Sequence, residues 1–490
     1  MVSFRKLFEM ISLSSVFRFQ KKIFYFAAIS LYAILFLPFI EQIPKITLDE
    51  NWIGNTAHTF TVETRFGNTV PGWDPLEYFY LLPFFIGTLF KIFGTTVLTA
   101  RLIMVAIGLI ALFGFLLILD HIDLSYRIRF GLTLLFITGQ SFYIHFRWLR
   151  PEGLVLAFLI WSVAFWLQSR YFWSALCIGL AISTHPIALI WGIPFWAGMV
   201  WNLLSFRNQK KEFLFSLLGG ILPLILLGLL WTFKGIPTPF LSERSIASQS
   251  NPLLFWGYNF IQFIKTYCQG WKRTGLFLVE SGILIAGLFF WKTERRIFWF
   301  SFLGLFSFLF GIVFVNPFRR RYFVMIVIYS LIVMAFLIKW LNQRQALWKW
   351  VCACILIFYG LNNAAGIGYL WAKGRQTTPY SEIREKIIPF IPKGSSILTH
   401  LEFWFPFQDY TVITDPKNLL KGSPVDYVVM TDIFSKALSP ITEAPSIHEK
   451  QVRDTPFDSH IMDLIHQKGH KVFSFATNGY GTIEVWKLSL

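Results

Sequence analysis

Asp49 and Glu50 stand side by side just after the first long apolar stretch, in the segment ITLDENWIGN (residues 46–55). A carboxylate at a membrane boundary can act as a general base towards an acceptor hydroxyl or amine, or bind a divalent metal ion. The alternative is a solvated loop, because an isolated Asp-Glu pair is a weak motif. Adjacent side chains diverge on a helix, so both need not enter a site. We predict that this pair supplies a catalytic carboxylate.

Three consecutive arginines, Arg319, Arg320 and Arg321 in NPFRRRY, form a second candidate site. They fall on the outer side of the membrane in the topology derived below, where Lys and Arg are scarce in short loops. The forked donors of Arg suit a phosphate group. This favours a phospholipid-like substrate that enters from the outer leaflet. Snorkelling of the side chains towards lipid headgroups is the alternative.

Four more polar residues stand where apolar segments begin or join: Arg150 and Glu152 in RWLRPEG, His185 in STHPIAL and Asp74 in WDPLEY. Glu152 either complements a helix dipole or completes a metal or acceptor site. His185 either contacts a phosphate or metal, or is a satisfied turn histidine. Asp74 is either a helix cap or a substrate contact.

The elements that position these residues must lie in a membrane. Of the 490 residues, 55% are hydrophobic and only 14% are charged, a composition that a soluble protein of this length could not bury. Repeated runs of about 18 or more apolar residues predict membrane-spanning helices. The sequence contains no P-loop, dinucleotide fingerprint or Cys/His metal spacing, so no nucleotide cofactor is expected.

The distribution of charge sets the topology. Basic and acidic residues balance in residues 372–490, so the whole excess of +17 belongs to residues 1–371. This fits the positive-inside rule and anionic lipid better than binding to nucleic acid. Five early basic residues place the N-terminus in the cytoplasm: Arg5, Lys6, Arg18, Lys21 and Lys22.

The first apolar run, Ile23–Ile40, is interpreted as a retained helix, followed by an outer loop over residues 41–96. We interpret Leu76–Phe93 as a juxtamembrane helix, because a span there would turn four basic loops outward. Further helices are expected at 97–119, 129–146, 152–168, 171–184, 186–204, 213–233, 274–291, 297–315, 321–341 and 346–370. The total is about eleven, which puts the C-terminus outside the cytoplasm.

Residues 372–490 read as a small α/β domain outside the membrane. YSEIREKIIPFI has the pattern of an amphipathic helix. Five stretches rich in β-branched and aromatic residues predict strands: SSILTH, YTVITD, VDYVVMT, KVFSFAT and TIEVWKL. The predicted division is therefore a membrane domain over residues 1–371 and an extracytoplasmic domain over residues 372–490.

The order of these motifs resembles that of the polyprenyl-phosphate-sugar-dependent glycosyltransferases of the GT-C membrane fold. These include protein mannosyltransferases, the lipid A aminoarabinose transferase and rhizobial lipopolysaccharide-type transferases. The matching pieces cover most of residues 20–345, and each is loose by itself: LDEN, DPLEYFYLLPFFIGTLFKIFG, ARLIMVAIGLIAL, RPEGLVLAF, ALCIGLAISTHP and RRRYFVMIVIYS.

The resemblance implies an inverting transfer at the outer face of the cytoplasmic (inner) membrane, from a polyprenyl-phosphate-linked sugar to a lipid, glycan or protein acceptor. Asp49 or Glu50 would deprotonate the acceptor. The leaving phosphate would be held by the arginine triplet, with Arg150 and His185. Some relatives use a divalent cation (Mg or Mn), and its ligands here would be Asp49 and Glu152. No nucleic acid partner is implied.

Two other functions compete with this one. A secondary transporter or lipid flippase would need polar groups near the bilayer midplane and usually two related halves. Here the polar groups cluster at one face, and no internal repeat is visible. An oligosaccharide ligase of the O-antigen type would also use outer arginines, but with a larger late outer loop than residues 234–273 provide.

Overall fold

The computed structural model describes residues 4–64, 67–70, 81–205, 210–234, 257, 260–261, 263–265, 271–314, 323–342, 346–414, 419, 424–431 and 459–489. The chain folds into two compact units. Unit 1 comprises residues 1–38, 105–146 and 151–368, and unit 2 comprises residues 39–104, 147–150 and 369–490. Unit 2 thus joins most of the first loop to the C-terminal part. The predicted domains, residues 1–371 and 372–490, are each one continuous stretch of sequence, and this division stays a prediction.

The helices of unit 1 lie close to the predicted ranges. Those wholly inside it are α1 (Phe4–Phe36), α5 (Tyr126–Thr138), α6 (Gln140–His145), α7 (Pro151–Leu167), α8 (Tyr171–Thr184), η1 (Pro186–Ala188), α9 (Leu189–Ser205), α10 (Lys210–Lys234), α12 (Trp271–Leu288), α13 (Arg295–Phe314) and α14 (Val324–Asn342). Two more, α4 (Val97–Ile122) and α15 (Ala346–Gln376), pass from one unit into the other.

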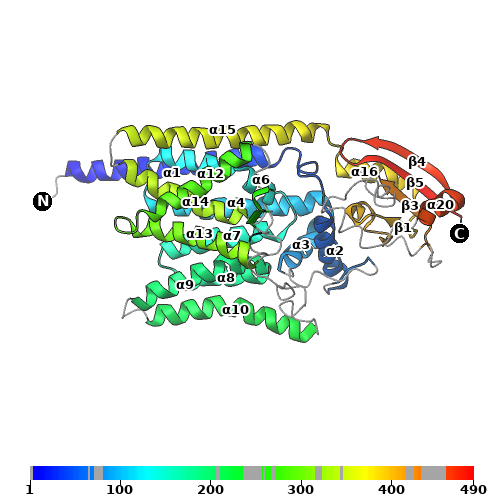
Figure 1. Ribbon diagram of the computed structural model, residues 1–490, viewed down its shortest axis with the longest axis horizontal. Helices are drawn as coiled ribbons and strands as arrows, with labels where there is room; N and C mark the ends of the chain where they lie inside the picture. The colour runs from blue at the N-terminus through cyan, green and yellow to red at the C-terminus, as the bar shows by residue number, and fades with distance from the viewer. Residues whose placement is uncertain are drawn as a thin grey trace. The chain divides into compact units, whose positions relative to one another are not determined.

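Helices α7, α8, α9, α10 and α13 of unit 1 lie side by side (Figure 1). Small residues allow the closest packing, as is usual between membrane helices. A Cβ on Gly179 of α8 would lie 2.5 Å from the carbonyl oxygen of Gly220 on α10. On α10, a Cβ on Gly219 would lie equally close to the carbonyl oxygen of Phe172. Side chains larger than hydrogen would therefore separate this pair of helices.

Five of the described helical segments are long and apolar enough to cross a membrane: Val97–Ile122, Lys211–Leu229, Arg295–Ile312, Val324–Leu341 and Ala353–Phe390. Five shorter apolar helices accompany them: Leu81–Phe93, Pro151–Leu167, Tyr171–Thr184, Pro186–Val200 and Thr274–Leu288. A predominantly helical chain with several membrane-length segments is therefore confirmed, whereas the total of about eleven spans stays a prediction.

Two helix predictions need correction. The first helix runs from Phe4 to Phe36 and not over Ile23–Ile40. The predicted helix 129–146 is two helices, because Gly139 between α5 and α6 has a non-helical ψ of 111°. At Pro186 the chain forms two separate helices. There His185 is extended, and a short 3₁₀ turn precedes α9.

The predicted loop over residues 41–96 contains a helix that was not predicted. Asp49 and Glu50 lie in the first turn of α2 (Leu48–Glu63) and not in irregular loop. The side chain of Glu50 accepts a hydrogen bond from the backbone N–H of Thr47, the N-cap residue, at 3.2 Å. This contact is half of a capping box, which satisfies one of the donors left open at a helix start.

Part of the predicted helix Leu76–Phe93 is present as α3 (Leu81–Phe93), residues 76–80 lie outside the described residues, and its juxtamembrane position stays a prediction. With 13 residues, α3 is shorter than the roughly 20 that a spanning helix needs. It packs against α2, where the Thr61 hydroxyl donates to the carbonyl oxygen of Gly87 at 2.9 Å. The two helices therefore form one layer of unit 2.

The C-terminal part of unit 2 contains a five-stranded sheet in the order β2-β1-β3-β5-β4. Its elements are α16 (Tyr380–Ile387), η4 (Ile388–Phe390), β1 (Ser396–Thr399), η5 (Leu401–Phe403), η6 (Phe405–Phe407), β2 (Thr411–Ile413), β3 (Tyr427–Thr431), α20 (Ser459–Lys468), β4 (Gly469–Thr477) and β5 (Gly481–Leu488). Strand β1 is parallel to β2 and β3, and β5 is antiparallel to β3 and β4.

All five predicted strands are present in this sheet. Its core consists of buried side chains from the strands and from α20: Leu398, Ile413, Val428, Met430, Ile461, Ile465 and Leu488. The connection from β1 to β2 contains the two 3₁₀ turns η5 and η6, and both contact α2. The sheet therefore presents this connection to the helix that carries the acidic pair.

Candidate active site

The two carboxylates of the acidic pair have different surroundings, although they are adjacent in α2. The Glu50 side chain is 1% exposed, whereas that of Asp49 is 35% exposed. Helix geometry separates neighbouring side chains by about 100° around the axis. One of the two can therefore be buried while the other meets solvent or a ligand.

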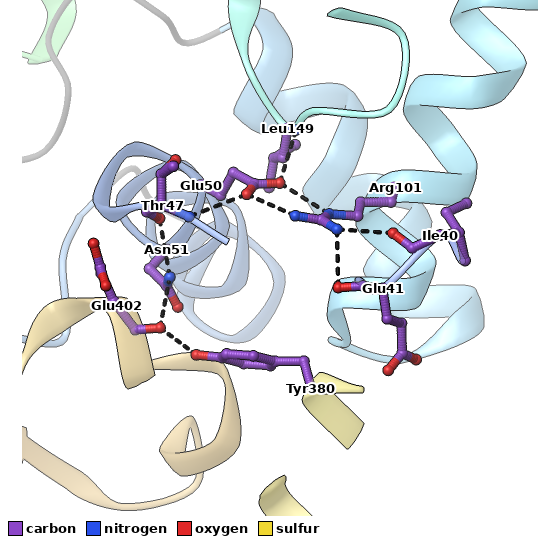
Figure 2. Close-up of polar contacts among 9 residues, drawn as sticks. All are labelled: Ile40, Glu41, Thr47, Glu50, Asn51, Arg101, Leu149, Tyr380 and Glu402. Carbon is purple, nitrogen blue, oxygen red and sulfur yellow. Dashed lines mark hydrogen bonds and ion pairs between the residues drawn. The ribbon is translucent and has the colours of Figure 1, made fainter. Parts of the chain in front are cut away.

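Glu50 is bound by a fork of donors (Figure 2). The Arg101 Nε donates to Glu50 Oε1 at 3.1 Å, and the Arg101 Nη2 donates to Oε2 at 2.9 Å. The backbone N–H of Leu149 also donates to Oε1, at 3.1 Å. Both side chains of the ion pair are buried, which leaves each charge dependent on its partner. Glu50 is thus a fixed structural anchor of the start of α2.

Arg101 extends this anchor to the chain segment before α2. Its Nη1 donates to the carbonyl oxygens of Ile40 and Glu41, at 2.8 and 3.0 Å. One guanidinium therefore ties α4, α2 and residues 40–41 together (Figure 2). The planar, multiply donating head of Arg makes this possible, and Lys could not reproduce the fork. Arg101 was not among the predicted site residues. The available signal was a charged residue in the first turns of a strongly apolar helix.

Asp49 forms a different ion pair. The Arg150 Nη2 lies 2.5 Å from Asp49 Oδ2, and Arg150 is 7% exposed. The guanidinium of Arg150 also lies over the ring of Trp148, 4.7 Å from its centroid. A cation–π contact of this kind restricts the guanidinium plane. The exposed face of Asp49 therefore adjoins a largely buried, oriented cation.

Known structures were compared with this fold. No family model and no curated protein matches the sequence. The crystal structure of ArnT from Cupriavidus metallidurans in the apo state matches with a TM-score of 0.58 at 11% identity, over 96% of this chain and 98% of ArnT. ArnT from the same organism bound to undecaprenyl phosphate matches with a TM-score of 0.57 at 10% identity, over 95% and 97%. The chain has the GT-C fold of ArnT.

The apo oligosaccharyltransferase from Archaeoglobus fulgidus also aligns, at 10% identity over 94% of this chain and 74% of that protein, but its TM-score of 0.49 supports no argument. The match to ArnT extends over nearly the full length of both chains. The predicted GT-C fold is therefore confirmed, and with it a multi-pass membrane architecture.

The other predicted phosphate ligands are distributed over the GT-C chain. His185 caps η1, since its Nδ1 accepts the backbone N–H of Ile187 at 2.9 Å. This contact leaves Nε2 as the ring nitrogen that carries a proton in the neutral form. Arg319, Arg320 and Arg321 lie outside the described residues, and so does Asp74. Among the predicted phosphate ligands, Arg150 is the described one that belongs to the same unit as Asp49.

The predicted metal ligands were tested against their surroundings. Glu152 is buried in the first turn of α7. Within the ranges that the structure describes, no group of three or more His, Cys, Asp and Glu side chains could hold a metal ion. At Asp49 the neighbouring group is the Arg150 cation, which does not suit a metal centre. The Arg150 cation therefore disfavours a metal ion on the Asp49 carboxylate, and the predicted site of Asp49 and Glu152 stays a prediction.

A second group of ionisable side chains lies between the start of α2 and the C-terminal sheet. Burial lowers the pKa of Lys45, whose ammonium lies 4.7 Å from the centre of the Tyr480 ring. Burial, with a smaller effect of Lys45, lowers the pKa of His400 to about 4. Burial raises the pKa of Glu402, and Lys45 partly offsets this. His400 is therefore neutral at physiological pH.

Proposed function

We propose that this chain is an inverting glycosyltransferase, which moves a sugar from a polyprenyl-phosphate donor to an acceptor at the outer face of the cytoplasmic membrane. The observation that carries the proposal is the Asp49–Arg150 pair: an accessible carboxylate within 2.5 Å of a largely buried guanidinium. The transfer requires a base for the acceptor and a cation for the leaving phosphate, and the pair offers one of each. The GT-C fold of the chain supports the same conclusion.

The reaction is a displacement at the anomeric carbon. The Asp49 carboxylate takes the proton from the acceptor hydroxyl or amine. The acceptor oxygen or nitrogen forms a bond to the anomeric carbon while the bond from that carbon to the phosphate oxygen breaks. The electron pair of the broken bond stays on the polyprenyl phosphate, and the configuration at the anomeric carbon inverts. No nucleotide takes part, so the donor suits a compartment without nucleotide sugars.

Arg150 stabilises the charge that develops on the leaving phosphate. A guanidinium held by Trp148 and Asp49 is already oriented before the donor arrives, so little reorganisation is needed during the reaction. Arg319, Arg320, Arg321 and His185 are proposed as further phosphate ligands on the strength of the sequence pattern. Glu152 and Asp74 are proposed to contact the acceptor.

Glu50 has a separate role in this proposal. Its oxygens already accept hydrogen bonds from Arg101, Leu149 and Thr47, so it is poorly placed to receive an acceptor proton. Among the two predicted catalytic acids, Asp49 is therefore the proposed base, and Glu50 positions the helix that carries it. The proposed steps use no metal ion, because a cation, Arg150, already lies beside Asp49.

Replacement of the base is the direct test. Asp49→Asn, purified in nanodiscs, should lose transfer by about 10²-fold or more while its melting temperature stays near that of the wild type. Glu63→Gln, at the exposed end of the same helix, is the matched control and should keep full activity. The assay follows donor consumption by mass spectrometry over a panel of undecaprenyl-phosphate-linked pentoses and hexoses. Undiminished transfer by Asp49→Asn would rule out Asp49 as the base.

The donor panel is chosen by comparing cell-envelope glycans from wild-type and deletion strains, since the missing sugar identifies the donor to synthesise. Cysteine-accessibility labelling tests the sidedness of the proposal. Position 49 and position 320 should both react from outside the cytoplasm, and labelling on opposite sides of the bilayer would contradict it. Counterflow of the lipid in reconstituted vesicles, without any glycosyl product, would indicate the transporter instead.

A further inference from the structure

The segment Glu402–Phe405, from the connection between β1 and β2, binds the first two turns of α2. The Asn51 Nδ2 donates to the carbonyl oxygen of Glu402 at 3.0 Å, and the backbone N–H of Phe405 donates to Asn51 Oδ1 at 3.2 Å. Asn51 has no exposed surface. One amide side chain thus pairs with a donor and an acceptor of a chain segment some 350 residues away, as a backbone strand would.

Two further positions on the same face of α2 touch this segment. A Cβ on Gly54 would lie 2.8 Å from Cε2 of Phe405 and closer still to its Cζ. One turn later, the ring of His58 meets that of Trp404 edge-on, with centroids 5.6 Å apart. Residues 51, 54 and 58 are spaced by three and four, so they share one helix face. The glycine is required because the aromatic ring occupies the space of a side chain.

The segment itself is fixed from the side of the sheet. Figure 2 shows that the Tyr380 hydroxyl donates to the same Glu402 carbonyl oxygen that accepts from Asn51. Burial holds the pKa of Tyr380 well above its ordinary value, so this hydroxyl stays a donor at all working pH values. His400 caps η5 by accepting the backbone N–H of Glu402 at 3.4 Å. Trp404 and Phe405 are both buried. The segment is therefore a rigid support.

We propose that Glu402–Phe405 positions the helix that carries the reactive carboxylate, and that Asn51 and Gly54 are positioning residues of the transfer reaction. This inference rests on the proposed function of Asp49. Asn51 lies two residues after Asp49 in α2, so a tilt of the helix at Asn51 also displaces the carboxylate. The C-terminal sheet then influences the reaction through α2, because it helps to fix the position of the Asp49 carboxylate.

Asn55 provides a matched control for Asn51. It is one turn further along α2, is equally buried, and also uses both amide atoms for hydrogen bonds outside its helix. Each amide makes one more bond locally: Asn51 Nδ2 donates to the Thr47 carbonyl oxygen at 3.1 Å, and Asn55 Oδ1 accepts the Thr59 hydroxyl at 3.4 Å. The Asn55 Nδ2 donates to the Thr69 hydroxyl at 2.8 Å, and its Oδ1 accepts the Thr69 backbone N–H at 2.9 Å. These bonds go to the neighbouring loop and not to the C-terminal part. Both substitutions therefore remove an amide side chain from α2. Asn51→Ala breaks the contact with the segment Glu402–Phe405, whereas Asn55→Ala breaks the contact with Thr69.

The first readout needs no substrate. Hydrogen–deuterium exchange of the full-length protein should rise across residues 48–54 in Asn51→Ala but stay near wild type there in Asn55→Ala. The second readout is the transfer assay, because a displacement of about 1 Å can cost roughly 10²-fold in rate. We expect Asn51→Ala to lower kcat about tenfold or more with the donor KM within about twofold, and Asn55→Ala to change kcat by less than about threefold.

A size exchange tests the second contact. Gly54→Ala should lower kcat in the same way, and Gly54→Ala combined with Phe405→Leu should recover at least half of the loss, because the smaller side chain makes room for the new methyl group. A purely structural contact would not give this recovery of kcat at constant melting temperature. Unchanged exchange and unchanged kcat in both Asn51→Ala and Gly54→Ala, with Asp49→Asn inactive, would overturn the positioning role and leave the proposed function standing. If the wild type transfers no sugar, the proposed function fails, and exchange then reports only whether Asn51 holds the start of α2 in place.

Discussion

Replacing Glu50 should affect stability far more than replacing Asp49, and the structure provides the magnitude. Glu50→Gln keeps the shape of the side chain but removes its charge. Arg101, with no exposed surface, then keeps a buried positive charge without its carboxylate partner. Breaking one side of a buried ion pair costs about 3–5 kcal/mol. Asp49 is about a third exposed, so Asp49→Asn should cost no more than about 1 kcal/mol.

The variants Glu50→Gln and Asp49→Asn should therefore differ in melting temperature. Unit 2 holds roughly 200 residues. A domain of that size shifts by about 2–4 °C per kcal/mol, so Glu50→Gln should melt roughly 6–20 °C lower and Asp49→Asn by no more than about 4 °C. The double variant Glu50→Met with Arg101→Met removes both charges together. It should recover most of the lost stability, since apolar residues often replace a buried ion pair without a penalty.

The measurement is thermal unfolding in nanodiscs by tryptophan fluorescence, run beside the transfer assay on the same samples. The double variant should be stable but slow, because the fork that orients the start of α2 is gone. Glu50→Gln with a wild-type melting temperature and no activity would refute the reasoning, since it would make Glu50 the reactive acid. A large loss of stability in Asp49→Asn would also refute the reasoning, because it would give Asp49 the structural role assigned to Glu50.

Two further predictions concern single side chains. The pKa of His400, lowered by burial from 6.5 to about 4, means that the unfolded chain binds more protons between those pH values, so stability falls as pH drops through that window. Asn at position 400 can still cap η5 but does not titrate, so His400→Asn should reduce this loss of stability at low pH by up to about 3 kcal/mol. The check is the melting temperature measured against pH, and the same pH dependence in wild type and variant would contradict the prediction. Arg150→Lys keeps the charge but loses the fork and the stacked plane, so initial rates of transfer should fall about tenfold, and a wild-type rate would argue against oriented phosphate binding.

The sequence predicted those features that depend on local pattern. Long apolar runs gave most helices to within a few residues, and the range 171–184 agrees with α8. The five strands were found because β-branched and aromatic residues cluster between turn residues. The boundary errors arose where a single residue breaks the pattern, as Gly139 does between α5 and α6.

Helix α2 was missed because its sequence, LDENWIGNTAHTFTVE, mixes polar and apolar residues without the continuous apolar face of an amphipathic helix. The local signal was present in Thr47 and Glu50, whose spacing is that of a capping box. What no single sequence could provide are the partners. Arg101 is 51 residues from Glu50, and Glu402 is 351 residues from Asn51. Such pairings depend on the tertiary fold and leave no periodic trace in the chain.

A buried ion pair is a weak source of stability, because removing two charges from water costs about as much as their attraction returns. The Glu50–Arg101 pair is therefore better explained by the geometry it imposes. It fixes the first turn of α2 from one side, and Asn51 fixes the next residues from the other. Asp49 precedes both in the first turn of α2, where it is about a third exposed and pairs with Arg150. A base that must meet the proton of an acceptor needs that orientation more than the fold does.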